Sequence, residues 1–149
     1  MDALNTTPLA PVSWGELLDK IAILEIKQDR ICDAERRRHV LRELALLSRV
    51  SAGVKAVPGL SPLCFRLKAV NRDLWEIEDA IREEEGAGRF GGRFVRLARS
   101  VYQRNDERAA IKRRINALLG SNLVEQKSYA GTDRAASAAS SSSALRAAV

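Results

Sequence analysis

The stretch NRDLWEIEDAIREEE, residues 71–85, decides the fold together with the segment that follows it. It carries seven acidic side chains against two arginines, a net charge of −5, and its apolar residues have helical spacing. Residues 89–114 carry nine basic side chains against two acidic ones, a net charge of +7. The glycine-rich segment GAGRFGG, residues 86–92, separates the two, and Phe90 and Phe94 are expected to pin this turn to the core. Because consecutive helices joined by a short turn lie side by side, we predict a charge-complementary helical hairpin.

Two further helices are predicted before this hairpin. Ser13 is a good N-cap, and Glu16 three residues later completes a capping box for a helix that runs to about residue 31. Its apolar residues lie on two sides: one side has Leu17, Ile21 and Leu24, the other Ile23 and Ile26. A helix that is apolar on two sides is expected at the centre of a bundle. Asp33 caps a second helix, which we expect to continue to about residue 54.

The segment KAVPGLSP, residues 55–62, then breaks the chain before the hairpin. We expect the third helix over residues 61–85 and the fourth over residues 91–119, with Gly120 as its C-cap. The predicted fold class is all-α, a mostly antiparallel bundle of four main helices. The predicted regions are a flexible N-terminal segment at residues 1–11, the helical bundle at 12–129 and a disordered Ala/Ser-rich tail at 130–149.

The net charge and composition of the chain argue against several classes of protein. The net charge is +6, but most of the positive charge belongs to the helix that faces an acidic neighbour, so a nucleic-acid surface is not expected. No stretch approaches the ~18 apolar residues of a membrane span, and we expect a cytoplasmic protein. The two cysteines, Cys32 and Cys64, are expected to be small core residues in a reducing compartment. The single histidine, His39, is expected at the surface because no partner ligand lies near it.

Polar residues interrupt the apolar faces of three helices. At about 100° per residue, Asn105, Arg108, Lys112 and Asn116 share the face of the fourth helix that also carries Val101 and Ile115. On the third helix Asn71, Glu78 and Arg82 lie beside the leucine seam, with Trp75 at its edge, and on the first helix Glu25 lies within the face set by Leu17. Burying an unpaired polar group costs roughly 2–7 kcal/mol. These side chains must therefore pair with one another, remain hydrated or bind a ligand.

Three interpretations of this polar stripe remain open. In the first, Glu25 and Glu78 pair with Arg82, Arg108 and Lys112 in a closed salt network that fixes helix register, as in a structural or oligomeric scaffold. In the second, the stripe lines an open cleft. The third is an all-α, Mg²⁺-dependent phosphohydrolase that uses the carboxylates Glu25, Asp29, Glu78 and Asp79.

We favour the open cleft, because two carboxylates against three cations leave an excess of +1 that suits an anionic ligand. The expected function is then a non-enzymatic module without a cofactor, which binds a phosphate- or carboxylate-bearing small molecule or a protein partner and is capable of self-association. Tyr102 and Trp75 would stack on a ring of the ligand. The candidate ligand-binding residues are Glu25, Asn71, Trp75, Glu78, Arg82, Tyr102, Asn105, Arg108, Lys112 and Asn116.

The longer blocks PVSWGELLDKIAILEIKQDRI, LKAVNRDLWEIEDAIREEE and FVRLARSVYQRNDERAAIKRRINALLGSNLVEQKSY resemble a family of small bacterial proteins known only as a domain of unknown function. The resemblance covers about residues 11–129 and rests on three blocks in the same order. One departure is Ile21-Ala22, where the pattern usually has Ile-Thr. The resemblance implies no activity; it implies that the core ends near Tyr129 and that the Ala/Ser-rich tail is an appendage.

Overall fold

The computed structural model describes residues 7–123, 125 and 126 of the chain. Over these residues it is all-helical, with four α-helices and no strand. The elements are α1 (Trp14–Arg30), α2 (Ala34–Ser51), a 3-10 turn η1 (Ala52–Val54), α3 (Leu60–Gly86) and α4 (Gly92–Leu119). The expected helices are confirmed to within one or two residues at most ends. The second helix stops earlier than expected, because its last residues tighten into η1.

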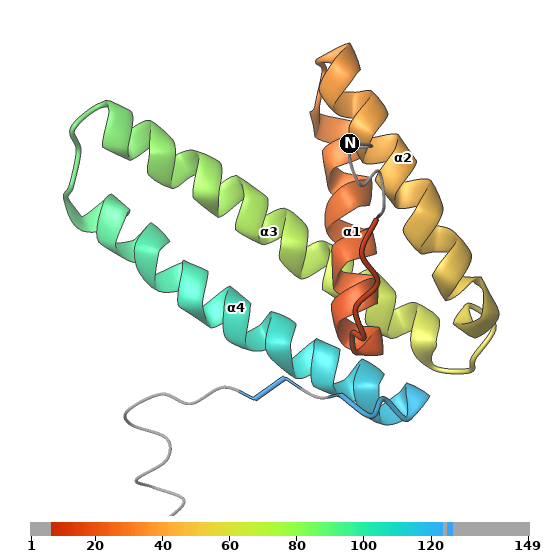
Figure 1. Ribbon diagram of the computed structural model, residues 1–149. Coiled ribbons are helices and arrows are strands. Elements are labelled where there is room, and N and C mark those ends of the chain that lie inside the picture. The colour runs from red at the N-terminus through yellow and green to blue at the C-terminus, as the bar shows by residue number, and fades with distance from the viewer. Residues whose placement is uncertain (1–6, 124, 127–149) are drawn as a thin grey trace, which may run out of the picture.

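The helices form two antiparallel hairpins, α1/α2 and α3/α4, and the first hairpin crosses one end of the second (Figure 1). α1 packs against α2, α3 and α4, which confirms its expected central position. α2 packs mainly against α1. The long α3/α4 hairpin extends well beyond the crossing (Figure 1).

The hydrophobic core lies where the two hairpins cross. Leu67 of α3 and Ile115 of α4 are fully buried, and Leu17 and Ile21 of α1 pack against them in one cluster. The buried positions of α3 are Leu60, Leu63, Leu67, Val70, Asn71, Leu74 and Glu84. The leucines and valine among them, from Leu60 to Leu74, are spaced by three and four residues, the helical period expected from the sequence, so this side of α3 faces its neighbours along the whole first half of the helix.

Beyond the crossing, α3 packs mainly against α4, although Arg30 at the end of α1 still bonds to Glu76 of α3. Between residues 75 and 108 only Glu84 is buried. The charge complementarity of the hairpin is confirmed by ion pairs between its two helices, such as Arg104 Nε to Asp73 Oδ2 at 3.3 Å. At the turn, Arg89 donates to Glu84 at 2.9 Å, and Arg93 also bonds to Glu84.

The two phenylalanines at the tip correct one expectation. Phe90 and Phe94 do not reach the core; their rings contact each other edge to face, with centroids 5.3 Å apart, and Phe90 is 58% exposed. The tip is too far from α1 along the hairpin for either ring to be covered by it (Figure 1).

Local signals at the helix ends are mostly confirmed. The Ser13 and Asp33 side chains accept hydrogen bonds from the backbone N–H groups of Glu16 and Arg36. Gly120 ends α4 in the left-handed conformation, with φ 63°. Cys32, expected in the core, is exposed because it falls in the turn between α1 and α2, whereas Cys64 is half-buried.

His39 lies on the exposed side of α2, as expected. None of the helices in the described part of the chain is long and apolar enough to cross a membrane. The expected N-terminal lead-in falls partly, and the expected C-terminal tail wholly, outside the described residues.

Candidate functional site

The polar stripe of α4 divides into two structures where α4 meets α1. Lys112 and Asn116, near its C-terminal end, are buried against the start of α1. Asn105 and Arg108, one to two turns earlier, line an open groove between α1, α3 and α4. A buried network and an open groove therefore lie side by side on α4, but the network is not the expected one, because Lys112 pairs with Glu16 and Glu125 and not with Glu25 or Glu78.

The closed structure satisfies the N-terminus of α1, and we call it the α1 junction; it comprises Ser13, Gly15, Glu16, Lys112, Asn116, Ser121 and Glu125. The first backbone N–H groups of a helix have no partner inside that helix. Here the N–H of Gly15 donates to Asn116 Oδ1 at 2.6 Å, and the N–H of Trp14 donates to Ser121 Oγ at 3.1 Å. The N–H of Glu16 donates to the Ser13 cap at 3.1 Å. Side chains from α4 and the segment after it thus cap α1.

Lys112 supplies the charge of the α1 junction. Its ammonium lies 2.6 Å from Glu16 Oε2 and 3.1 Å from Glu125 Oε2, and the residue is 7% exposed. Burial lowers the pKa of Lys112, but the hydrogen bonds to Glu16 and Glu125 outweigh it and leave the pKa raised. Glu16, expected as half of a capping box, thus directs its carboxylate to a lysine of another helix.

The groove, with a volume of about 450 Å³, is the candidate functional site. It contains six of the ten candidate residues: Asn71, Trp75, Glu78 and Arg82 from α3, and Asn105 and Arg108 from α4. Its remaining lining residues are Ile23, Leu74 and Asp79. Its lining comes from three helices, α1, α3 and α4, and α1 diverges from the α3/α4 hairpin beyond the crossing (Figure 1).

A chain of hydrogen bonds fixes the floor of the groove. Asn71 Nδ2 donates to Asp19 Oδ1 at 2.8 Å, and Arg108 Nη1 donates to Asn71 Oδ1 at 3.2 Å. Asp19 and Asn71 are each 5% exposed. A buried carboxylate of α1 therefore orients the amide of α3, and the amide in turn holds the guanidinium of α4 at the edge of the groove.

Asp19 was not among the predicted residues, because the polar face predicted for α1 was the one that carries Leu17 and Glu25. Asp19 and Glu16 lie on the side of α1 that carries Ile23 and Ile26, and this side faces the groove and α4. Because α1 is apolar on both sides, the sequence also allowed a polar site at the acidic residues of the second side, Glu16 and Asp19.

Glu25 lies on the other side of α1, which corrects its expected pairing with the cations of α4. Its carboxylate is 2.7 Å from Lys68 Nζ in a separate pocket. Tyr102 is 52% exposed on α4 and is not part of the groove lining. Glu78 and Arg82 form a loose pair across one turn of α3, at 3.7 Å.

The groove differs in charge from the expected site. The expected excess of +1 included Lys112, which the α1 junction removes from the groove. Arg82 and Arg108 now stand against Glu78 and Asp79, so the formal charges of the lining cancel. The groove offers guanidinium donors, carboxylate acceptors and the half-buried ring of Trp75.

The four carboxylates expected for a magnesium site do not converge. Glu78 and Asp79 line the groove, but Glu25 is in the separate pocket and Asp29 is exposed near the end of α1. Within residues 7–123, 125 and 126, no three metal-ligating side chains of the His, Cys, Asp or Glu type form a group.

Comparison with known proteins confirms the resemblance seen in the sequence, but the match also includes most of the Ala/Ser-rich tail, which the resemblance had left out as an appendage. Residues 10–146 match a family described as a family of unknown function (DUF6165). No curated protein and no solved structure matches the chain.

Proposed function

Since the chain belongs to a family of unknown function (DUF6165), its activity has to be argued from its own geometry, and we propose that it is a non-enzymatic binding module. The site we propose is the groove between α1, α3 and α4. Grooves between helices are the usual ligand sites of helical bundles, and a volume of about 450 Å³ suits a small molecule. The free thiols of Cys32 and Cys64 suit a reducing compartment, so we further propose a cytoplasmic location.

The observation that carries this proposal is the hydrogen-bonded chain from Asp19 through Asn71 to Arg108. Desolvating a carboxylate and an amide is costly, and the cost is tolerated where both groups are fully bonded. The result is a guanidinium whose position is fixed before any ligand arrives. Preorganised donors reduce the entropy lost on binding, which makes Arg108 a suitable anchor for an anion.

The zero net charge of the groove lining indicates which class of ligand would fit. Arg108 and Arg82 would bind a carboxylate or phosphate, while Glu78 and Asp79 would accept hydrogen bonds from hydroxyl or ammonium groups of the same molecule. The ring of Trp75 offers an apolar surface for a sugar or a planar group. The ligand we propose is therefore a small anion that also carries donors, such as a sugar phosphate or an amino acid.

Thermal unfolding with a panel of sugar phosphates, amino acids and inorganic phosphate tests this proposal. A ligand that binds the native state at a hundred times its Kd stabilises it by about 2.7 kcal/mol, so the midpoint rises. We expect such a rise for at least one compound that combines an anion with donors. Arg108→Gln should weaken the binding of that compound by about 10- to 100-fold, because a charged hydrogen bond contributes about 1.5–3 kcal/mol.

Arg99→Gln is the matched control, because Arg99 is an exposed arginine of α4 outside the groove. It should leave the shift in midpoint unchanged. An equal loss in both variants would mean that general positive charge, not the groove, attracts the ligand. Metal-dependent turnover of a phosphoester, abolished by Glu78→Gln, would replace the proposal with the hydrolase that sequence analysis considered.

A further inference from the structure

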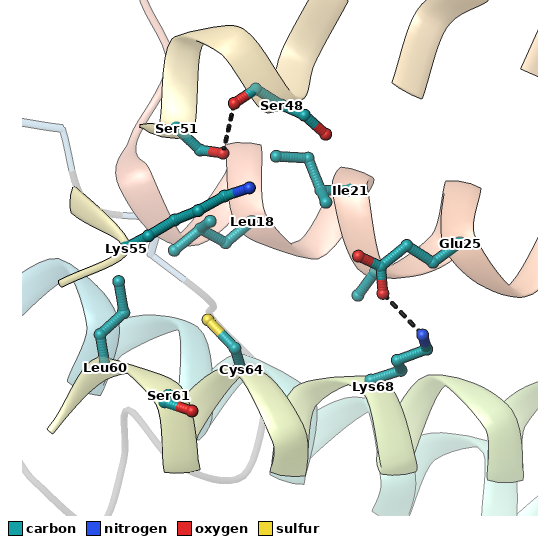
Figure 2. Close-up of a pocket in the computed structure, with 11 residues that line it drawn as sticks. Leu18, Ile21, Glu25, Ser48, Ser51, Lys55, Leu60, Ser61, Cys64 and Lys68 are labelled. Atoms are coloured by element: carbon teal, nitrogen blue, oxygen red, sulfur yellow. Dashed lines mark hydrogen bonds and ion pairs between the residues drawn. The ribbon is translucent and has the colours of Figure 1, made fainter. Parts of the chain in front are cut away.

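A second pocket lies between α1, α2 and α3, on the side of α1 away from the groove. Its volume is about 300 Å³, and Figure 2 shows its lining residues. α2 and α3 both pack against α1 but hardly against each other, so the angle between them leaves space above α1. Protein interiors normally fill such space with large aliphatic side chains.

This pocket is lined at several of its positions by small side chains. Ala22, Ser48, Ser51 and Cys64 line it from three helices, while Leu18 and Leu60 form an apolar wall. Leu18 and Leu60 are 8% and 2% exposed. The pocket is therefore a partly open cavity whose lining combines an apolar wall with small polar side chains.

Two lysines line the pocket, on different sides of it (Figure 2). Lys68 is paired with Glu25 at 2.7 Å, which leaves the pair neutral. Lys55 has no ion pair among the described residues, and Figure 2 shows its side chain extending along the pocket between α1 and α2. The lining thus has a single excess positive charge beside an apolar wall.

We propose that this pocket binds a small aliphatic monocarboxylate. The tail would lie against Leu18, Leu60 and Cys64, and the carboxylate would pair with Lys55. One negative charge matches the single excess positive charge, whereas a phosphate monoester would bring nearly two. The apolar wall gains free energy only if the ligand carries a hydrocarbon portion.

Cys64 is a built-in reporter of occupancy. Its sulfur points from α3 toward the interior of the pocket (Figure 2). Burial, followed by the negative charge of Glu25, raises the pKa of the Cys64 thiol. The thiol therefore stays protonated at neutral pH and reacts slowly with alkylating reagents, and a ligand against it would slow the reaction further.

The test follows alkylation of Cys64 in a Cys32→Ser protein, which leaves one thiol, with hexanoate titrated through the millimolar range. We expect protection that grows as 1 + [L]/Kd, about tenfold at nine times the Kd. Hexanol and hexylamine have the same number of carbon atoms as hexanoate but no carboxylate, so hexanol should protect more weakly and hexylamine, a cation, least. The midpoint of thermal unfolding, a second readout, should rise in the same order.

Two pairs of variants distinguish binding in the pocket, through the charge of Lys55 and the space beside Ser48, from a general effect on the stability of the protein. Lys55→Gln should reduce the protection by hexanoate to that by hexanol, whereas Lys20→Gln, a lysine of α1 outside the pocket, should leave the difference intact. Ser48→Leu should fill the pocket and abolish both the protection of Cys64 by hexanoate and the rise in the unfolding midpoint. Ala45→Leu, on the exposed side of α2, should abolish neither. Equal effects of the three probes, or no effect of hexanoate on either readout, would overturn the proposal.

Arg108→Gln keeps this test separate from that of the groove. Arg108 does not line this pocket, so its substitution should leave protection by hexanoate unchanged. Loss of protection in Arg108→Gln would show that hexanoate binds in the groove, which contradicts the present inference without contradicting the proposed function.

Discussion

At the scale of single residues, Gly15 shows how closely α1 approaches α4. A Cβ atom at this position would lie 2.7 Å from the backbone oxygen of Lys112 and 2.9 Å from Asn116 Oδ1. The same Asn116 oxygen accepts the N–H of Gly15 at 2.6 Å. The absence of a side chain therefore allows the cap to form, because any Cβ would push the N-terminus of α1 away from its acceptor.

We predict that Gly15→Ala destabilises the protein. Helix propensity alone favours alanine by about 1 kcal/mol, whereas overpacking costs about 1–3 kcal/mol and the bond to Asn116 would be strained as well. The expected net loss is about 1–3 kcal/mol in the free energy of unfolding, measured with urea. Gly86→Ala, where a Cβ meets no atom within 4 Å, is the control and should be neutral or slightly stabilising. A stable Gly15→Ala protein would mean that α1 and α4 can separate freely.

Single residues also show how much of the candidate site could be predicted from the sequence. Asn71, Arg82 and Arg108 could be found from helical spacing, because each stands on the inner side of a helix with one clear apolar face. Glu25 could not be distinguished from Asp19 in this way, because α1 has two apolar sides. Which side meets α4 depends on how the hairpins cross, and spacing within one helix carries no information about that.

At the scale of elements, Glu84 closes the α3/α4 hairpin at its tip. It is the one buried residue in the distal half of the hairpin, and both Arg89 and Arg93 bond to it. The hydrogen bond from Arg89 lowers the pKa of Glu84, burial opposes this, and the charges of Arg89 and Arg93 lower it further. The turn at residues 86–91 is thus held by one carboxylate.

We predict that Glu84→Gln loosens the tip without unfolding the core. Amides of residues 86–92 should lose hydrogen-exchange protection, while those of Leu67 and Ile115 should keep theirs. Because the folded pKa is lowered, the contribution of Glu84 is present above the unfolded value of about 4.5 and is lost as the pH falls through the folded pKa. Protection factors of the wild-type tip should therefore approach those of the variant in acid.

Glu85→Gln provides the comparison for the tip, since Glu85 is an exposed neighbour outside the ion pairs described. It should leave the protection factors unchanged. If both substitutions loosen the tip alike, the net acidity of α3 holds the hairpin together and not the contact at Glu84.

The helices also show which predictions depend on neighbouring residues alone and which depend on how the helices are arranged. Caps at Ser13, Asp33 and Gly120 depend on a few neighbouring residues, and all three were predicted. The expectation that Phe90 and Phe94 reach the core was wrong, because their burial depends on where α1 crosses the hairpin. α1 is shorter than α3 and α4 and covers only one end of them (Figure 1).

At the scale of the whole molecule, α1 joins the two hairpins, and the α1 junction is the polar part of that connection. Lys112 of α4 binds Glu16 of α1 and Glu125 of the segment after α4. The apolar part is the cluster that includes Leu17 and Ile115. Since α2 depends on α1 for its packing, weakening the junction should affect the global stability of the molecule.

We predict that Lys112→Met lowers the free energy of unfolding in a pH-dependent way. Near pH 8 the loss should be about 1.5–3 kcal/mol, the contribution expected of a charged hydrogen bond. The pKa of Lys112 is raised on folding, so its contribution is fully present below the unfolded value of about 10.5 and is lost as the pH rises through the folded pKa. The difference between wild type and variant should therefore shrink above pH 10.5.

Urea unfolding of both proteins at a series of pH values measures this difference, and groups that titrate equally in both proteins cancel from it. Lys20→Met removes an exposed lysine paired with Glu43 and should cost about 0–1 kcal/mol, with little change over the same range. A constant difference between pH 8 and strongly alkaline pH would assign the role of Lys112 to the packing of its methylene groups. The α1 junction would then hold the hairpins together through its neutral caps, Asn116 and Ser121, and not through its charge.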